Sequence, residues 1–125
     1  MNYGRKLSGG KYHKARKRKL YEKSGQTRNV KLGEIKKRIL KTRSGAYKTT
    51  LLASNTANII DKKTNKAKIS KIINVLETPS NRFLARQNII TKGTLIETEL
   101  GKARVTSRPS QESAINAILI HEEKK

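Results

Sequence analysis

The chain has 125 residues, of which 30 are Lys or Arg and 9 are Asp or Glu, so its formal net charge is +21. It has no Cys, one Asp and two His, which excludes disulfide frameworks and thiolate chemistry and leaves few groups for acid–base or metal sites. The longest apolar run has four residues, and the basic N-terminus contains no apolar segment. We therefore expect neither a membrane-spanning helix nor a signal peptide.

Charge and apolar residues follow opposite gradients along the chain. Residues 1–48 hold 17 Lys or Arg and 2 acids, whereas residues 49–125 hold 13 and 7. Of the 28 Leu, Ile, Val and Phe residues, only Leu7 and Leu20 precede position 30. Such a segment cannot bury enough apolar surface to offset the entropy of ordering it. The sequence therefore predicts a basic arm at residues 1–29, ordered only against a partner, and a β-barrel domain at residues 30–125.

From Val30 onward, short β-branched runs alternate with turn formers, which is typical of an all-β domain. The predicted strands are residues 34–41, 47–53, 56–60, 67–76, 95–100, 102–106 and 114–120. In the fourth strand, period-two spacing places Ile69, Ile73 and Val75 on one face. Many short strands with little helix indicate a small closed barrel or a sandwich, and closure removes exposed edge strands. We expect an all-β fold, with a small β-barrel body and an extended basic N-terminal arm.

A single helical turn is predicted over residues 81–87, between the fourth and fifth strands. Ser80 or Asn81 precedes it as the capping residue, and Phe83 is expected to pack inward. Residues 88–93 follow as a tight connection back into the barrel.

The arm is the strongest candidate for a functional site, with 11 basic residues and one acid in residues 1–31. Its cations are too dense to pair with each other, and its glycines let the backbone fit closely against an irregular surface. Tyr3, Tyr12 and Tyr21 lie among the cations, as expected where rings meet exposed RNA bases. The arm residues predicted to bind RNA are Arg5, Lys6, Ser8, Gly9, Gly10, Lys11, Tyr12, His13, Lys14, Arg16, Lys17, Arg18, Lys19, Lys23 and Arg28.

Other interpretations of the arm are a nuclear-localisation-type run or a merely solvated tail. A membrane-surface helix requires an apolar face opposite the basic one, and the arm has none. The charge pattern favours nucleic acid as the partner.

Two further groups of cations extend the predicted RNA-binding surface. One lies on the barrel and comprises Lys31, Lys36, Lys37, Arg38, Lys41, Arg43 and Lys48. The other comprises Arg82 and Arg86, which share one side of the helical turn, together with Lys92.

Glu97 and Glu99 fall on one face of a predicted strand. Three interpretations are an acid–base dyad, a metal site, or cross-strand pairs with Lys102 and Arg104. We favour the pairs, because two such carboxylates rarely form a site by themselves. No set of nucleophile, base and orienting group can be assembled for an enzyme. We predict no catalytic residue, metal, cofactor or small-molecule substrate. An RNA-modifying enzyme using Glu97, Glu99 and Asp61 is the alternative from another class. A free-standing chromatin protein or nucleic-acid chaperone is the alternative binding protein.

Several motifs of the chain resemble one known family, the eighth "e-type" small-subunit ribosomal proteins of archaea and eukaryotes. Residues 5–10 carry its basic residue and Ser-Gly-Gly signature, and residues 16–19 carry the Lys/Arg cluster. Residues 80–82, 88–93 and 96–109 are similar to later parts of that family. The chain lacks the long insertion of eukaryotic members, so it resembles the archaeal form.

The resemblance implies a β-barrel body whose arm threads into small-subunit ribosomal RNA. It implies structural and assembly roles without catalysis, in the cytoplasm within the ribosome. The implied partners are that RNA and neighbouring ribosomal proteins.

Overall fold

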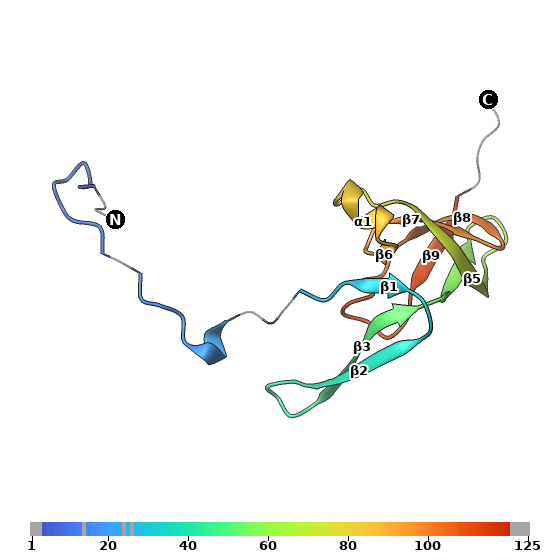
Figure 1. Ribbon diagram of the computed structural model, residues 1–125, viewed down its shortest axis with the longest axis horizontal. Helices are drawn as coiled ribbons and strands as arrows, with labels where there is room; N and C mark the ends of the chain where they lie inside the picture. The colour runs from blue at the N-terminus through green and yellow to red at the C-terminus, as the bar shows by residue number, and fades with distance from the viewer. Residues whose placement is uncertain (1–3, 14, 24, 26, 121–125) are drawn as a thin grey trace.

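The computed structural model describes residues 4–13, 15–23, 25 and 27–120. The regular secondary structure of this part is nearly all strand, with one short α-helix, so the predicted all-β class is confirmed (Figure 1). All seven predicted strands are present, each within two residues at either end. The elements are η1 (Leu20–Glu22), β1 (Val30–Leu32), β2 (Lys36–Lys41), β3 (Tyr47–Ser54), β4 (Thr56–Asp61), β5 (Lys66–Glu77), α1 (Arg82–Arg86), β6 (Ile89–Ile90), β7 (Leu95–Thr98), β8 (Gly101–Val105) and β9 (Asn116–Leu119).

Five strands close into a barrel in the order β4-β5-β7-β8-β9. Neighbouring strands are antiparallel except for β4 and β9, which run parallel and complete the closure. Closure leaves none of these strands as a free edge, which is the expected solution for a small sheet. The predicted barrel is therefore confirmed.

A second sheet of four strands, in the order β2-β3-β1-β6, lies beside the barrel. Strand β1 runs parallel to β3 and antiparallel to β6, where Val30 pairs with Ile90. Strand β1 was not predicted, and Ile89–Ile90 was predicted as part of a connection, because strands this short show no periodicity of their own. Pairing and burial with distant residues define them instead.

One apolar core joins the barrel and the four-stranded sheet. Its buried members come from both sheets and are Val30, Leu51, Ala57, Ile59, Ile72, Val75, Ile90, Ile96, Ala103, Val105, Ile115 and Ala117. Half-buried Ala85 of α1 packs against this cluster. The helix and the four-stranded sheet are therefore mounted rigidly on the barrel.

The predicted inner face of β5 is wrong. Ile69 and Ile73 are 77% and 59% exposed, whereas Ile72 is 6% exposed and Val75 is buried. The register against β7 shifts between Ile72 and Asn74, so the strand contains a bulge. Because a bulge adds one residue, side chains before and after it change faces.

The β7–β8 hairpin accounts for one of the two predicted glutamate pairings. Glu97 lies opposite Lys102 in the register, as expected, but Arg104 lies opposite Leu95. Glu99 falls in the turn that follows β7. The two glutamates therefore do not share a strand face as a dyad requires.

Candidate nucleic-acid interface

The arm extends away from both sheets, and β1 connects it to the core (Figure 1). No described residue before Val30 is buried, and only Glu22 and Arg28 are half-buried. Lys14 and Tyr3, both singled out in the sequence, lie outside the described residues. The described arm therefore presents its cations to solvent.

Residues 5–11 of the arm form a miniature hairpin. Arg5 and Lys11 pair as an antiparallel bridge, and the Gly9 N–H donates to the Lys6 carbonyl at 2.9 Å. Gly9 has φ +79°, a conformation that costs little only for glycine. The Arg5 guanidinium donates to the Gly9 carbonyl at 3.0 Å and braces the loop. The Ser-Gly-Gly motif therefore closes a defined turn.

Gly10 plays a different part from Gly9 in this hairpin. It has no positive φ, and a Cβ added there would approach only the Ser8 hydroxyl, at 3.9 Å. The free protein therefore needs glycine at position 9 and has room for a side chain at position 10.

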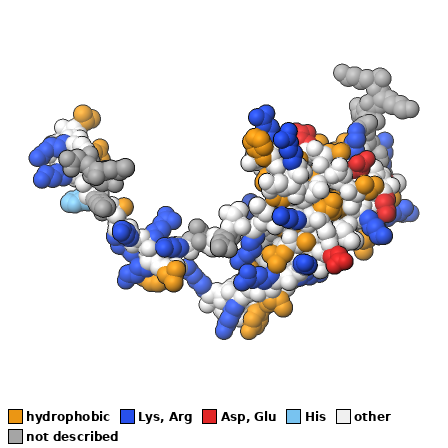
Figure 2. All heavy atoms as spheres, viewed as in Figure 1, with side chains coloured by type: hydrophobic (Ala, Val, Ile, Leu, Met, Phe, Trp, Pro, Cys, Tyr) orange, Lys and Arg blue, Asp and Glu red, His pale blue; other side chains and the backbone are white. Residues whose placement is uncertain are grey.

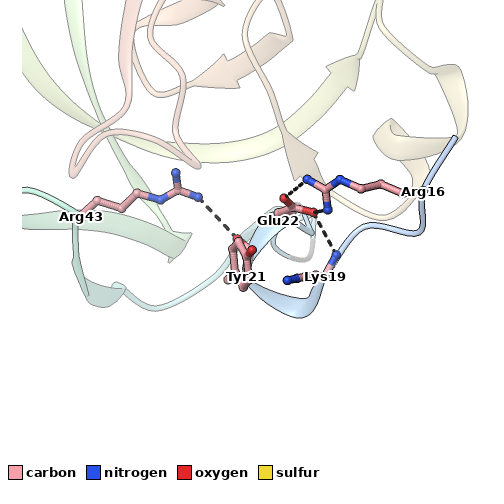
Figure 3. Close-up of polar contacts among 5 residues, drawn as sticks. All are labelled: Arg16, Lys19, Tyr21, Glu22 and Arg43. Carbon is pink, nitrogen blue, oxygen red and sulfur yellow. Dashed lines mark hydrogen bonds and ion pairs between the residues drawn. The ribbon is translucent and has the colours of Figure 1, made fainter.

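A second turn in the arm is built around its one described acid, Glu22 (Figure 3). The Arg16 guanidinium donates to both carboxylate oxygens, at 2.6 and 2.9 Å, and the Lys19 backbone N–H donates at 3.0 Å. The hydrogen bonds from Arg16 and then from Lys19 lower the pKa of the Glu22 carboxyl. The sequence pattern does not indicate this role, because the ion pair spans six residues outside any regular helix.

This turn contacts the loop between β2 and β3. The Arg43 guanidinium donates to the Tyr21 carbonyl at 3.5 Å, which links residues 22 positions apart (Figure 3). The ammonium groups of Lys6 and Lys19 lie 5.6 and 5.9 Å from the ring centroids of Tyr12 and Tyr21. The cations of the arm are therefore interleaved with aromatic rings, as the sequence indicated.

The cations expected on the barrel lie elsewhere, and this prediction is wrong in its placement. All of them belong to the four-stranded sheet or to the β2–β3 loop: Lys31, Lys36, Lys37, Arg38, Lys41, Arg43 and Lys48. The sequence grouped them with the barrel because strand patterns do not reveal which sheet a strand joins.

The β2–β3 hairpin carries cations on both of its faces. Lys41 pairs with Tyr47, and Lys48 pairs with Leu40 one position along. Since alternate residues point to opposite faces, Lys37 and Lys41 lie on one side, and Arg38 and Lys48 lie on the other. The Lys48 ammonium also donates to the Gln111 side chain at 2.6 Å. This hairpin therefore carries positive charge on both faces and has no single flat basic face.

Helix α1 presents the predicted second cluster at the surface. The Asn81 side chain caps it by accepting from the Phe83 N–H at 2.9 Å, so the cap is Asn81 and not Ser80. Arg82, Phe83 and Arg86 line one surface pocket, and Lys92 is exposed in the turn before β7. Phe83 is 56% exposed, so the expectation that it packs inward is wrong.

Positive charge covers every part of the visible surface. In Figure 2 Lys and Arg side chains lie along the arm and also over the sheets, where the visible acidic side chains are found. Across the described residues, no cluster of three His, Asp or Glu side chains is placed to hold a metal ion. Nor does any helix in these residues have the length and apolar character needed to cross a membrane.

Together these features define a class: a small, basic all-β protein whose exposed arm and hairpin are rich in cations. Comparison with known proteins identifies the family. A profile described as Ribosomal protein S8e matches residues 1–120. The chain therefore belongs to the Ribosomal protein S8e family, whose members are ribosomal structural proteins and not enzymes. The predicted family and the predicted lack of catalysis are confirmed.

Three archaeal relatives, each named small ribosomal subunit protein eS8, match over nearly their whole length. The protein of Sulfolobus acidocaldarius is 45% identical over 123 residues, covering 97% of this chain and 95% of the relative. That of Methanococcus aeolicus is 46% identical over 121 residues, covering 94% and 93%. That of Ignicoccus hospitalis is 48% identical over 118 residues, covering 93% and 91%.

Proposed function

We propose that this protein is a structural constituent of the small ribosomal subunit in the cytoplasm. In this role it binds and stabilises ribosomal RNA through the arm and the cations of the four-stranded sheet, beside neighbouring ribosomal proteins. The family supports a ribosomal structural role. RNA binding is supported by the exposed arm, in which no described residue is buried and positive charge is dense.

The shape of the arm supports binding to a folded RNA. A chain with a net charge of +21 repels itself, and a polyanion offsets that repulsion. The 5–11 hairpin and the Arg16–Glu22 turn hold local shape without a hydrophobic core. Such pre-formed turns lower the entropy that is lost on binding. Phosphates then supply the counter-charge that the protein itself lacks.

The two-sided β2–β3 hairpin supports insertion between RNA segments. The cations on both faces can all contact phosphates only when RNA lies on both sides of the hairpin. The side chains of Ile39 and Tyr47, also on this hairpin, are exposed and available for contact with sugars and bases. The arm and this hairpin, linked through Arg43 and the Tyr21 carbonyl, would act together.

The experiment is assembly of small subunits with a variant lacking residues 1–24. We expect the variant to fold but to be absent from the small-subunit peak in sucrose gradients. Normal incorporation of the variant would refute the role of the arm. The same charge favours a second candidate function, that of a nucleic-acid chaperone. If the protein has that function, even the full chain should be absent from the small-subunit peak at moderate salt.

Matched charge variants separate local contacts from net charge. One replaces three arm cations by glutamine, Lys17→Gln, Arg18→Gln and Lys19→Gln. The other removes the same charge from the exposed loop and first residue of β5, Lys62→Gln, Lys63→Gln and Lys66→Gln. We expect only the arm variant to lose incorporation. Equal losses would indicate that net charge alone matters.

A further inference from the structure

We propose that Arg82, Phe83 and Arg86, the α1 patch, bind one unpaired nucleotide of RNA, with the base stacked on Phe83 and its phosphates held by the arginines. This inference rests on the proposed RNA-binding function and adds a base-stacking site, away from the arm, to that function. The three side chains line one pocket on α1. In Figure 1 α1 and the β2–β3 loop lie on opposite sides of β1, so the two contacts would engage separate RNA segments.

The ring of Phe83 is placed for stacking. It is the only Phe in the chain, and 56% of its surface is exposed although α1 lies next to the apolar core. The Arg82 guanidinium lies 5.3 Å from the ring centroid. Unpaired bases stack on exposed aromatic rings and on the planes of Arg guanidinium groups, and this patch offers both.

The patch is held on a rigid support. The Asn81 cap fixes the start of α1, and the Gln87 N–H donates to the Leu84 carbonyl at 3.1 Å and closes its end. Ala85, on the same helix, packs against the core. A stacking surface fixed in this way loses little conformational entropy when a base binds.

The arginines are free to bind phosphate. No carboxylate of the described residues lies within ion-pair distance of Arg82 or Arg86, so neither guanidinium group is neutralised by an acid there. An apolar protein partner would have to desolvate both guanidinium groups, which is costly without acids opposite them. Duplex RNA keeps its bases stacked on each other and offers no free ring face. A single-stranded nucleotide satisfies the ring and both charges together.

The test uses the full chain carrying Phe83→Trp. The natural chain has no Trp, so position 83 becomes the only indole fluorophore. We expect single-stranded RNA oligonucleotides to quench its fluorescence by stacking and an RNA duplex of equal charge to leave it nearly unchanged. The control is Leu100→Trp, also exposed but in the turn after β7, which should respond to neither RNA. Equal responses to both RNAs, or quenching at both positions, would overturn the proposal.

A second measurement does not depend on the new fluorophore. Binding to small-subunit ribosomal RNA should weaken about fivefold or more in Phe83→Leu, with an unchanged salt dependence. Arg86→Gln should instead reduce the slope of log affinity against log salt by about one. If Phe83→Leu binds like the natural chain while salt-sensitive binding by the arm persists, the stacking site is refuted and the proposed RNA-binding function stands. If the natural chain does not bind this RNA at all, the proposed function fails as well.

Discussion

Removing the arm should change the salt dependence of RNA binding by a calculable amount. Deletion of residues 1–24 removes nine Lys or Arg residues. One of them, Arg16, is held by both oxygens of Glu22, so eight remain available for phosphates. Each neutralised phosphate adds about 0.7–0.9 to the slope of log affinity against log salt, because it releases condensed counterions. The full chain should therefore have a slope about six to seven units steeper than the truncated one.

The assay is binding of small-subunit ribosomal RNA at a series of KCl concentrations. Between about 100 and 200 mM salt, the affinity of the full chain should fall about a hundredfold more than that of the truncated chain. Thermal unfolding of the truncated chain serves as the control. Its transition should be unchanged, because no described residue before Val30 belongs to the core.

Two results would refute this reasoning. A slope difference below about three would mean that most arm cations do not meet phosphates. A lower unfolding temperature after truncation would mean that the arm stabilises the sheets in the free protein.

Three further predictions concern single residues. Ile72→Ala should destabilise the fold by about 2–5 kcal/mol and Ile73→Ala by about 1 kcal/mol or less, measured by urea unfolding; equal effects would contradict the bulge in β5. The Thr78 hydroxyl is buried without a hydrogen-bond partner among the described residues, so Thr78→Val should stabilise by about 1 kcal/mol. Thr94→Val, which removes an acceptor of the Thr91 N–H at 3.0 Å, should destabilise instead; stabilisation by both would contradict the assignment. Because the pKa of Glu22 is lowered from its ordinary value of 4.5, the carboxylate should stabilise its turn above that pH, and this stabilisation should be lost as the pH falls through the lowered value. NMR shifts of residues 16–22 should follow this loss and be independent of pH in Glu22→Gln.

The exposed arm and the local hairpins could be predicted from sequence, because both depend on residues close together in the chain. The arm has few apolar residues to bury, and this composition alone keeps it off the core. The β2–β3 and β7–β8 hairpins join consecutive strands across short turns; Gly45 lies in the first turn and Gly101 begins β8 directly after the second, each with positive φ. Turn residues and period-two patterns record such contacts directly.

The candidate site was predicted in its residue types more fully than in its geometry. The sequence identified Arg82 and Arg86 as one cluster, and they do line one pocket. It placed Phe83 inside because apolar residues are usually buried, yet Ala85 is the residue of α1 that packs against the core, and Phe83 is exposed. The ion pair between Arg16 and Glu22 was not predicted, because its spacing follows no helical or strand period.

Composition and local pattern, then, determined the cationic arm, the all-β class, the seven longer strands and the capped turn. Tertiary structure alone decided the parallel pairings of β1 with β3 and of β4 with β9, the two-residue strand β6, and the sheet on which the hairpin cations lie. It also decided the inner face of β5, where a bulge shifts the register. The physical reason is that these features depend on partners distant in the chain, whose positions follow from burying one common core.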